Sequence, residues 1–143
     1  MNLGYCCINL TLKEDGVSTN RGMIKRTFQE RGKSYAGELA LKNIEDLFTI
    51  LNWNEERGVK VFRISSSLFP WMSEYKFEDL PQWREIKDQL KKCGDFILEK
   101  GHRVGFHPGQ FCVLPSPTPK VVDATIDELD KHSIILDTMG LPP

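Results

Sequence analysis

The chain has 143 residues, of which 40% are hydrophobic and 27% are charged, and its formal net charge is −1. A chain of this length forms one domain or part of one, and this composition excludes a disordered tail. The near-neutral charge also excludes a general attraction to nucleic acid, so any contact with nucleic acid must depend on local patches.

The sequence also predicts the cellular compartment. No apolar run is long enough to cross a bilayer, and the first ten residues have neither a cationic region nor a small-residue cleavage site. The four cysteines contain no C-x-x-C pattern. We therefore expect no membrane association, reduced thiols and a cytoplasmic location.

The first half of the chain predicts one strand and two helical stretches. The short apolar segment Asn2–Asn9 is typical of a buried strand, and the polar segment Thr11–Asn20 is typical of a loop. A short helix follows within Arg21–Gly32, where Gly32 ends it, and a longer helix follows over Ser34–Arg57. The longer helix has apolar residues at helical spacing along one face.

The second half alternates strands with helices. Val59–Ser65 is predicted as a strand and is followed by a long loop that ends near Gln82. A helix over Trp83–Lys100, a strand over Arg103–Pro108 and a helix over Lys120–Met139 complete the order. Strands separated by helices of this length form right-handed crossovers in a parallel sheet, so the fold class is α/β.

The alternation of side chains along the strands predicts the kind of sheet. Arg63 and Ser65 share one face of their strand and His107 shares the corresponding face of the next, whereas Phe62 and Phe106 lie on the opposite faces. A sheet covered by helices on both sides is apolar on both faces. A barrel is apolar outside and polar at its inner mouth, so the pattern predicts a partial (β/α) TIM barrel comprising about three β-α units.

The strongest candidate for chemistry is His107, at the predicted carboxyl end of a strand, where barrel enzymes build their sites. A histidine that is merely hydrogen-bonded in the mouth is an equally open alternative. Gln110 and Phe111 follow on a turn, as a polar–aromatic pair that can stack on bases or as an ordinary loop pair.

Weaker candidates lie elsewhere in the chain. Tyr5 and Asn9 are predicted to line the same mouth, although a tyrosine there often only satisfies its own hydroxyl. Glu74 lies in the long loop and is by itself a surface acid. His132, on an apolar helix face, and His102, at the entry of a strand, favour structural roles. No P-loop, G-x-G-x-x-G, nucleophile elbow or H-E-x-x-H is found.

Four segments together resemble the UV damage endonuclease family. They are "LGYCCIN", "ELALKNIEDLFTILNWNEERGVKVFRISSSLFP", "VGFHPGQF" and "IDELDKHSIILDTMGL". The resemblance implies a TIM barrel related to endonuclease IV, of which residues 1–143 are the N-terminal portion of a single domain. It implies a DNA-repair endonuclease that uses a divalent metal, with manganese the usual choice. Such an enzyme binds damaged double-stranded DNA and nicks its backbone on the 5′ side of UV photoproducts.

The resemblance also implies roles for particular residues. His107 matches a catalytic metal ligand, and Gln110 and Phe111 match the pair that probes the duplex opposite the lesion. Tyr5 and Asn9 match residues that approach the lesion.

This sequence departs from the family in three respects. Phe111 stands where the family usually has tyrosine, which keeps the stacking face and loses the hydroxyl. Glu74 stands where the family has a metal-binding histidine, and a carboxylate suits manganese. The family's later ligands lie on strands beyond these 143 residues.

Two alternatives therefore stay open. One is an incomplete barrel that binds DNA or a partner subunit without catalysis. The other is a metal-dependent barrel enzyme acting on a small molecule. In either case the open sheet predicts self-association, or association with a complementary C-terminal half.

Overall fold

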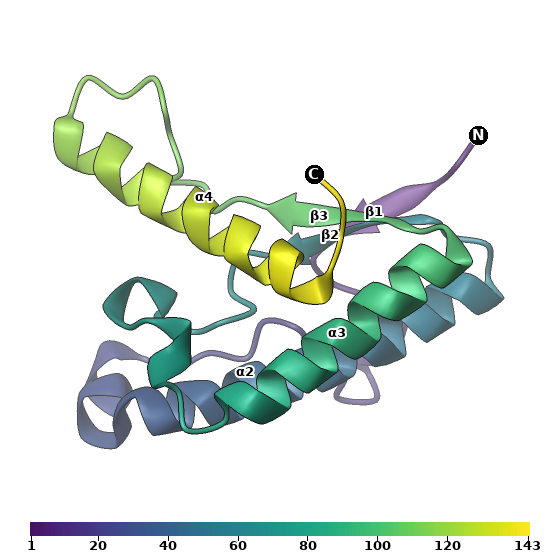
Figure 1. Cartoon of the computed structure of the whole chain (residues 1–143), viewed down its shortest axis with the longest axis horizontal. Helices are drawn as coiled ribbons and strands as arrows, with labels where there is room; N and C mark the ends of the chain where they lie inside the picture. Colours follow the sequence, from purple (N-terminus) through teal and green to yellow (C-terminus); the bar gives the residue numbers. More distant parts are fainter.

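A computed structural model describes all residues 1–143. The strands β1 (Gly4–Cys6), β2 (Val61–Ser65) and β3 (Arg103–His107) form one parallel sheet in the order β1-β2-β3 (Figure 1). The helices are α1 (Leu10–Lys13), α2 (Lys25–Glu56), α3 (Trp83–Lys100) and α4 (Pro119–Met139), with short 3₁₀ turns η1 (Met72–Glu74) and η2 (Phe77–Asp79). The predicted α/β class with parallel strands is confirmed.

The strand register separates a buried face of the sheet from an open one. Tyr5 pairs with Phe62, and Ile64 pairs with Phe106. The side chains of Phe62, Ile64 and Phe106 are buried under the helices. The neighbouring positions Arg63 and His107 are exposed. The sheet thus has one apolar face covered by helices and one polar face without cover, as the alternation predicts for part of a barrel.

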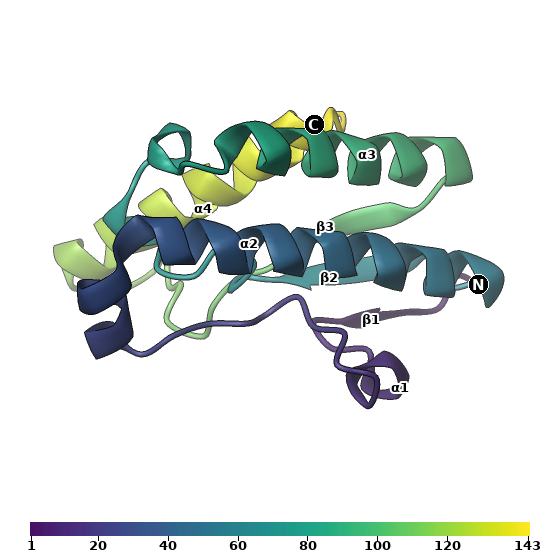
Figure 2. The same cartoon turned by 90° about the horizontal axis from the view of Figure 1, so that it is seen from below.

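The helices α2 and α3 lie side by side against the apolar face, and α4 packs on α3 (Figure 2). The contact of α3 with α4 depends on a small residue, because a Cβ added to Gly94 of α3 would lie 1.8 Å from the carbonyl oxygen of Met139. Bare backbone at Gly94 therefore lets the end of α4 approach α3 closely, and this approach completes the core on that side.

Gly32 interrupts α2, as the sequence predicts. Its backbone has φ 66° and ψ −164°, a combination that residues with a Cβ rarely adopt. The chain therefore forms two helical segments that meet at a kink, and the second segment supplies the residues buried against the sheet.

Two predictions about the N-terminal region are wrong. The strand Asn2–Asn9 shrinks to Gly4–Cys6, because Cys7 adopts a left-handed backbone with φ 62° and turns the chain out of the strand after its N–H has donated to Arg63 O. The loop Thr11–Asn20 begins with the one-turn helix α1, whose N-cap is Asn9, with its side-chain oxygen accepting from Leu12 N. A single turn is too short to produce a visible hydrophobic period.

A charged cluster lies at the opposite end of the sheet from the carboxyl ends of the strands. Glu55 accepts from Lys60 Nζ, and His102 Nε2 lies 2.6 Å from the same carboxylate oxygen. The side chain of His102 is 1% exposed, so the structural role predicted for it agrees with its position. The hydrogen bond from Lys60 and the one from His102 lower the pKa of Glu55 below its ordinary value.

This cluster predicts a pH-dependent stability. A carboxyl whose pKa is lowered on folding stabilises the fold above its ordinary pKa, and the contribution disappears as pH falls through the lowered pKa. We expect Glu55→Gln to lower the urea midpoint at neutral pH and to leave it almost unchanged at about pH 3. The neighbouring exposed Glu56→Gln is the control, and an equal loss for both variants at neutral pH would rule out the cluster as the cause.

None of the helices combines the length and the apolar character needed to span a membrane.

Candidate functional site

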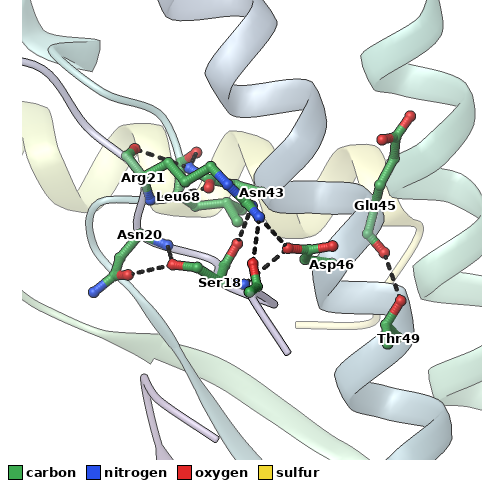
Figure 3. A network of polar contacts seen from close by, with 9 residues as sticks. Ser18, Asn20, Arg21, Asn43, Glu45, Asp46, Thr49 and Leu68 are labelled. Carbon is green, nitrogen blue, oxygen red and sulfur yellow. Dashed lines mark hydrogen bonds and ion pairs between the residues drawn. The ribbon is translucent and has the colours of Figure 1, made fainter. Parts of the chain in front are cut away.

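The loops that follow β1 and β2 are both hydrogen-bonded to one buried amide, the side chain of Asn43, at the carboxyl end of the sheet (Figure 3). The side chain of Asn43, on α2, accepts from Arg21 N at 3.0 Å and donates to Arg21 O at 3.2 Å. It also donates to Leu68 O at 3.0 Å, in the loop after β2. Asn43 is completely buried, so these bonds form away from water, where an unpaired polar group is costly.

A second set of contacts secures the loop after β1. Asp46 accepts from Ser18 N at 2.8 Å and forms an ion pair with Arg21 at 2.6 Å. The Arg21 guanidinium in turn donates to the carbonyl oxygens of Ser18 and Gly16. The loop therefore has a defined shape although it contains little regular structure.

Removing the buried amide should loosen both loops. Asn43→Ala would leave the N–H and C=O of Arg21 and the C=O of Leu68 without their partner, and we expect a loss of about 2 kcal/mol in the free energy of unfolding. Urea unfolding would measure it. Asn52→Ala removes an amide of the same helix that bonds only Phe48 O, and it should cost much less. Equal losses would contradict the fastening role of Asn43.

A hollow of about 440 Å³ opens between these loops and α4. Its wall has hydroxyl and amide groups from Ser66, Ser67 and Asn20, the indole of Trp71, and the carboxylates of Asp127 and Glu128. The hollow borders the turn after β3, since a Cβ placed on Gly109 would lie within 4 Å of both Ser66 and Glu128.

His107 is the last residue of β3 and is exposed on the uncovered face of the sheet. Its partner in the register is Ser65, the last residue of β2. The structure therefore places His107 where the sequence predicts it, at the carboxyl edge of the sheet.

Gln110 and Phe111 occupy the two central positions of a tight turn. Cys112 N donates to Gly109 O at 2.9 Å and closes the turn. Both central side chains are exposed, and Phe111 is 82% exposed. Neither residue has a positive φ, so this turn accepts most side chains at both positions. A largely exposed phenylalanine at the tip of a turn makes little contact with its own fold.

The loop that carries this turn is held by α4. Gly109 N donates to Glu128 Oε1 at 2.7 Å, and Val113 N donates to Thr125 Oγ1 at 2.9 Å. Neither anchor is predicted by the sequence. The only signal available was their spacing of three residues on one helix face, which is common in helices and does not identify a loop anchor.

Tyr5 lies on the sheet face opposite to that of His107, and Asn9, the N-cap of α1, is hydrogen-bonded to Tyr5, so the prediction that both line the mouth with His107 is wrong. Tyr5 is opposite Phe62 in the register, and its ring packs edge-on against that of Phe62 at 5.0 Å on the helix side of the sheet. Its hydroxyl donates to Asn54 Oδ1 at 2.6 Å and accepts from Asn9 Nδ2 at 2.8 Å. Parity along a strand assigns residues to two faces, but only the register tells which face matches that of the next strand.

Glu74 lies in η1, after β2, and is exposed. Within residues 1–143, no three His, Cys, Asp or Glu side chains gather closely enough to hold a metal ion. His107, at the end of β3, and Glu74, in the segment after β2, thus belong to no closed metal site.

His132 lies on α4 against β3. Its ring stacks on Phe106 with 4.1 Å between centroids and 1° between planes. Burial lowers the pKa of His132, which favours the neutral form of its ring. Its position agrees with the structural role predicted from the sequence.

These features define a class of protein: a partial (β/α) barrel with polar and aromatic side chains at the carboxyl ends of its strands. Over residues 1–143 the sequence matches the UV-endonuclease UvdE family, and the chain belongs to that family. The resemblance stated from the sequence is confirmed.

Known relatives have the same segment within longer chains. The chain is 36% identical over 141 residues to a protein of Acanthamoeba polyphaga mimivirus, covering 98% of this chain and 43% of that protein. It is 33% identical over 141 residues to the UV-damage endonuclease of Schizosaccharomyces pombe, covering 97% and 23% respectively. The crystal structure of SacUVDE superposes with a TM-score of 0.85 at 32% identity, covering 99% of this chain and 46% of that chain. The chain therefore spans less than half the length of these relatives.

Proposed function

We propose that this chain carries the damage-recognition part of a DNA-repair endonuclease that acts on UV-damaged DNA. The observation that carries the proposal is the turn with exposed Gln110 and Phe111 beside His107, in a chain of the UvdE family. An aromatic side chain without contacts to its own fold gains a partner when it stacks on an unpaired base.

A divalent metal, with Mn²⁺ as the proposed ion, would act at the same edge. His107 and Glu74 would each supply one ligand, and an imidazole with a carboxylate suits manganese. These two donors fit part of a coordination sphere and do not complete one, so the remaining ligands must come from other residues. The metal would lower the pKa of a bound water and stabilise charge on the phosphate. Nicking on the 5′ side of the photoproduct belongs to the same proposal.

The proposal places residues 1–143 as the N-terminal portion of a single barrel domain. A barrel needs about eight strands, and the sheet here has three, with one side of β1 and one side of β3 unpaired.

The four free cysteines support a cytoplasmic location with reduced thiols.

The second candidate is a module that binds DNA or a partner without catalysis. The two open sheet edges favour it, since unpaired strand edges promote association with another chain. Here we propose either self-association or pairing with a complementary C-terminal half.

Binding and nicking assays on the chain test the first candidate. We expect tighter binding to an irradiated duplex than to the same duplex before irradiation, sedimentation as an associated species, and no nicking of irradiated plasmid in Mn²⁺. A monomer that cuts at photoproducts would contradict the proposal that His107 and Glu74 hold only part of the metal site. Equal binding to both duplexes would contradict damage recognition itself.

A further inference from the structure

One face of α4 carries three side chains that contact β3 and the loop after it. Thr125, Glu128 and His132 follow each other at spacings of three and four residues, which places them in one row along the helix. Thr125 and His132 are buried, and the side chain of Glu128 is 25% exposed. The row is therefore an internal contact of the fold and not a solvated helix face.

The first two members of this row hold the loop on both sides of the turn. Glu128 accepts from the N–H of Gly109, immediately before Gln110, and Thr125 accepts from the N–H of Val113, two residues after Phe111. The hydrogen bond from Cys112 N to Gly109 O closes the turn between these two points. Three hydrogen bonds thus fix the segment 109–113, from which the side chains of Gln110 and Phe111 project into solvent.

The third member fixes the helix to the strand. The His132 ring lies parallel to that of Phe106, the residue before His107, and its Nε2 is 4.0 Å from Glu128 Oε1. The stacking sets the distance between α4 and β3, so the two anchors meet the loop at a fixed position.

The choice of a carboxylate at position 128 is informative. A negative charge beside a DNA-binding turn weakens attraction to the phosphate backbone. An ionised oxygen, however, forms a stronger hydrogen bond to a backbone N–H than a neutral one. A rigid turn also avoids the loss of conformational freedom that a mobile loop suffers when it enters the duplex. The carboxylate of Glu128 therefore strengthens the hydrogen bond that orders the turn, although its charge lowers the general affinity of this surface for DNA.

We propose that Glu128 and Thr125 are positioning residues, which hold Gln110 and Phe111 ready to enter the duplex at a lesion. The inference rests on the proposed function, because it assigns a role within that same site. It states that the two anchors determine the preference for damaged DNA without touching DNA bases.

Paired substitutions separate the hydrogen bonds from the shape of the side chains. Thr125→Val keeps the shape and removes the acceptor, whereas Thr125→Ser keeps the acceptor. Glu128→Ala removes the acceptor, whereas Glu128→Gln keeps a carbonyl oxygen at the same place. Asp130→Ala, on the exposed face of the same helix, is the control for a lost charge.

Two measurements are made on each variant of the chain. The first is amide hydrogen exchange of residues 109–113 by NMR. The second is the ratio of Kd values for unirradiated and irradiated duplex of one sequence. We expect Thr125→Val and Glu128→Ala to speed exchange in this segment and to lower the ratio by about three- to tenfold, as expected for one lost hydrogen bond. Thr125→Ser and Asp130→Ala should retain the wild-type ratio, and Glu128→Gln, whose neutral oxygen bonds Gly109 N less strongly, should give a ratio between those of Glu128→Ala and the wild type.

The outcomes distinguish the inference from the proposed function. Faster exchange with an unchanged ratio would overturn the positioning role and leave damage recognition intact. Unprotected amides at Gly109 and Val113 in the wild type would also overturn it. A wild-type ratio near one would instead refute the proposed function, and the positioning role with it. Circular dichroism identifies any variant that has lost its fold, and the serine and glutamine variants then decide the matter.

Discussion

Replacing Gln110 and Phe111 together by alanine is expected to weaken binding to UV-damaged duplex about a hundredfold and to change binding to undamaged duplex little. Stacking of the Phe111 ring on a base contributes roughly 1–3 kcal/mol, which is about tenfold or more in affinity, and a hydrogen bond from the Gln110 amide adds roughly 1 kcal/mol. The exposed Phe111 has almost no contact to lose in the free protein, so the effect should lie in the complex alone. Titration of both duplexes with wild type and variant measures it.

Leu114→Ala is the matched control for this experiment. Leu114 is an exposed apolar residue of the same loop, and its loss removes a similar apolar surface outside the turn. It should leave the preference for damaged DNA unchanged. If the double variant lost affinity for both duplexes equally, Gln110 and Phe111 would be general DNA contacts and not lesion probes.

Gly94→Ala should be among the most destabilising single substitutions in the chain. The new methyl group would lie 1.8 Å from the backbone oxygen of Met139, and a backbone carbonyl cannot rotate away as a side chain can. The end of α4 would have to move, and overpacking of this kind costs about 3 kcal/mol. This outweighs the gain of about 1 kcal/mol that alanine brings to a helix interior. Urea unfolding followed by circular dichroism would show the change.

Gly37→Ala provides the comparison. Gly37 is also a buried helical glycine, but its added Cβ would meet the tip of the Gln82 side chain, at 2.0 Å. That side chain can turn aside, so the substitution should be nearly neutral. Equal destabilisation by both variants would mean that the contact between α3 and α4 is not specially close.

The fold could be predicted largely from the sequence because its long elements are strongly patterned. The helix predicted over Trp83–Lys100 has those bounds in the structure, and the interruption at Gly32 lies where a glycine ends the first helical pattern. The alternation along β2 and β3 correctly separated the buried face from the open one. The spacing of apolar residues and the glycines that end helices are local properties of the chain, so they can be recognised directly in the sequence.

The candidate site was predicted less completely because it depends on contacts between distant residues. The position of His107 follows from its strand, but the place of Tyr5 depends on a register that the short strand β1 does not encode locally. The hydrogen bonds of Asn43 with Arg21 and Leu68 join three segments that are distant in the sequence. The anchors Glu128 and Thr125 bond to backbone N–H groups, which almost every residue type has, so the partner positions cannot be recognised from the sequence.

The backbone of the turn at Gln110 and Phe111 has a consequence for how this protein family can diverge. Since neither position has a positive φ and neither side chain packs on the fold, mutation at both is free of folding constraints. Selection on these two residues can then follow the chemistry of the lesion alone. A lineage could exchange phenylalanine for tyrosine, or glutamine for another polar residue, in a single step and without compensating changes elsewhere in the barrel.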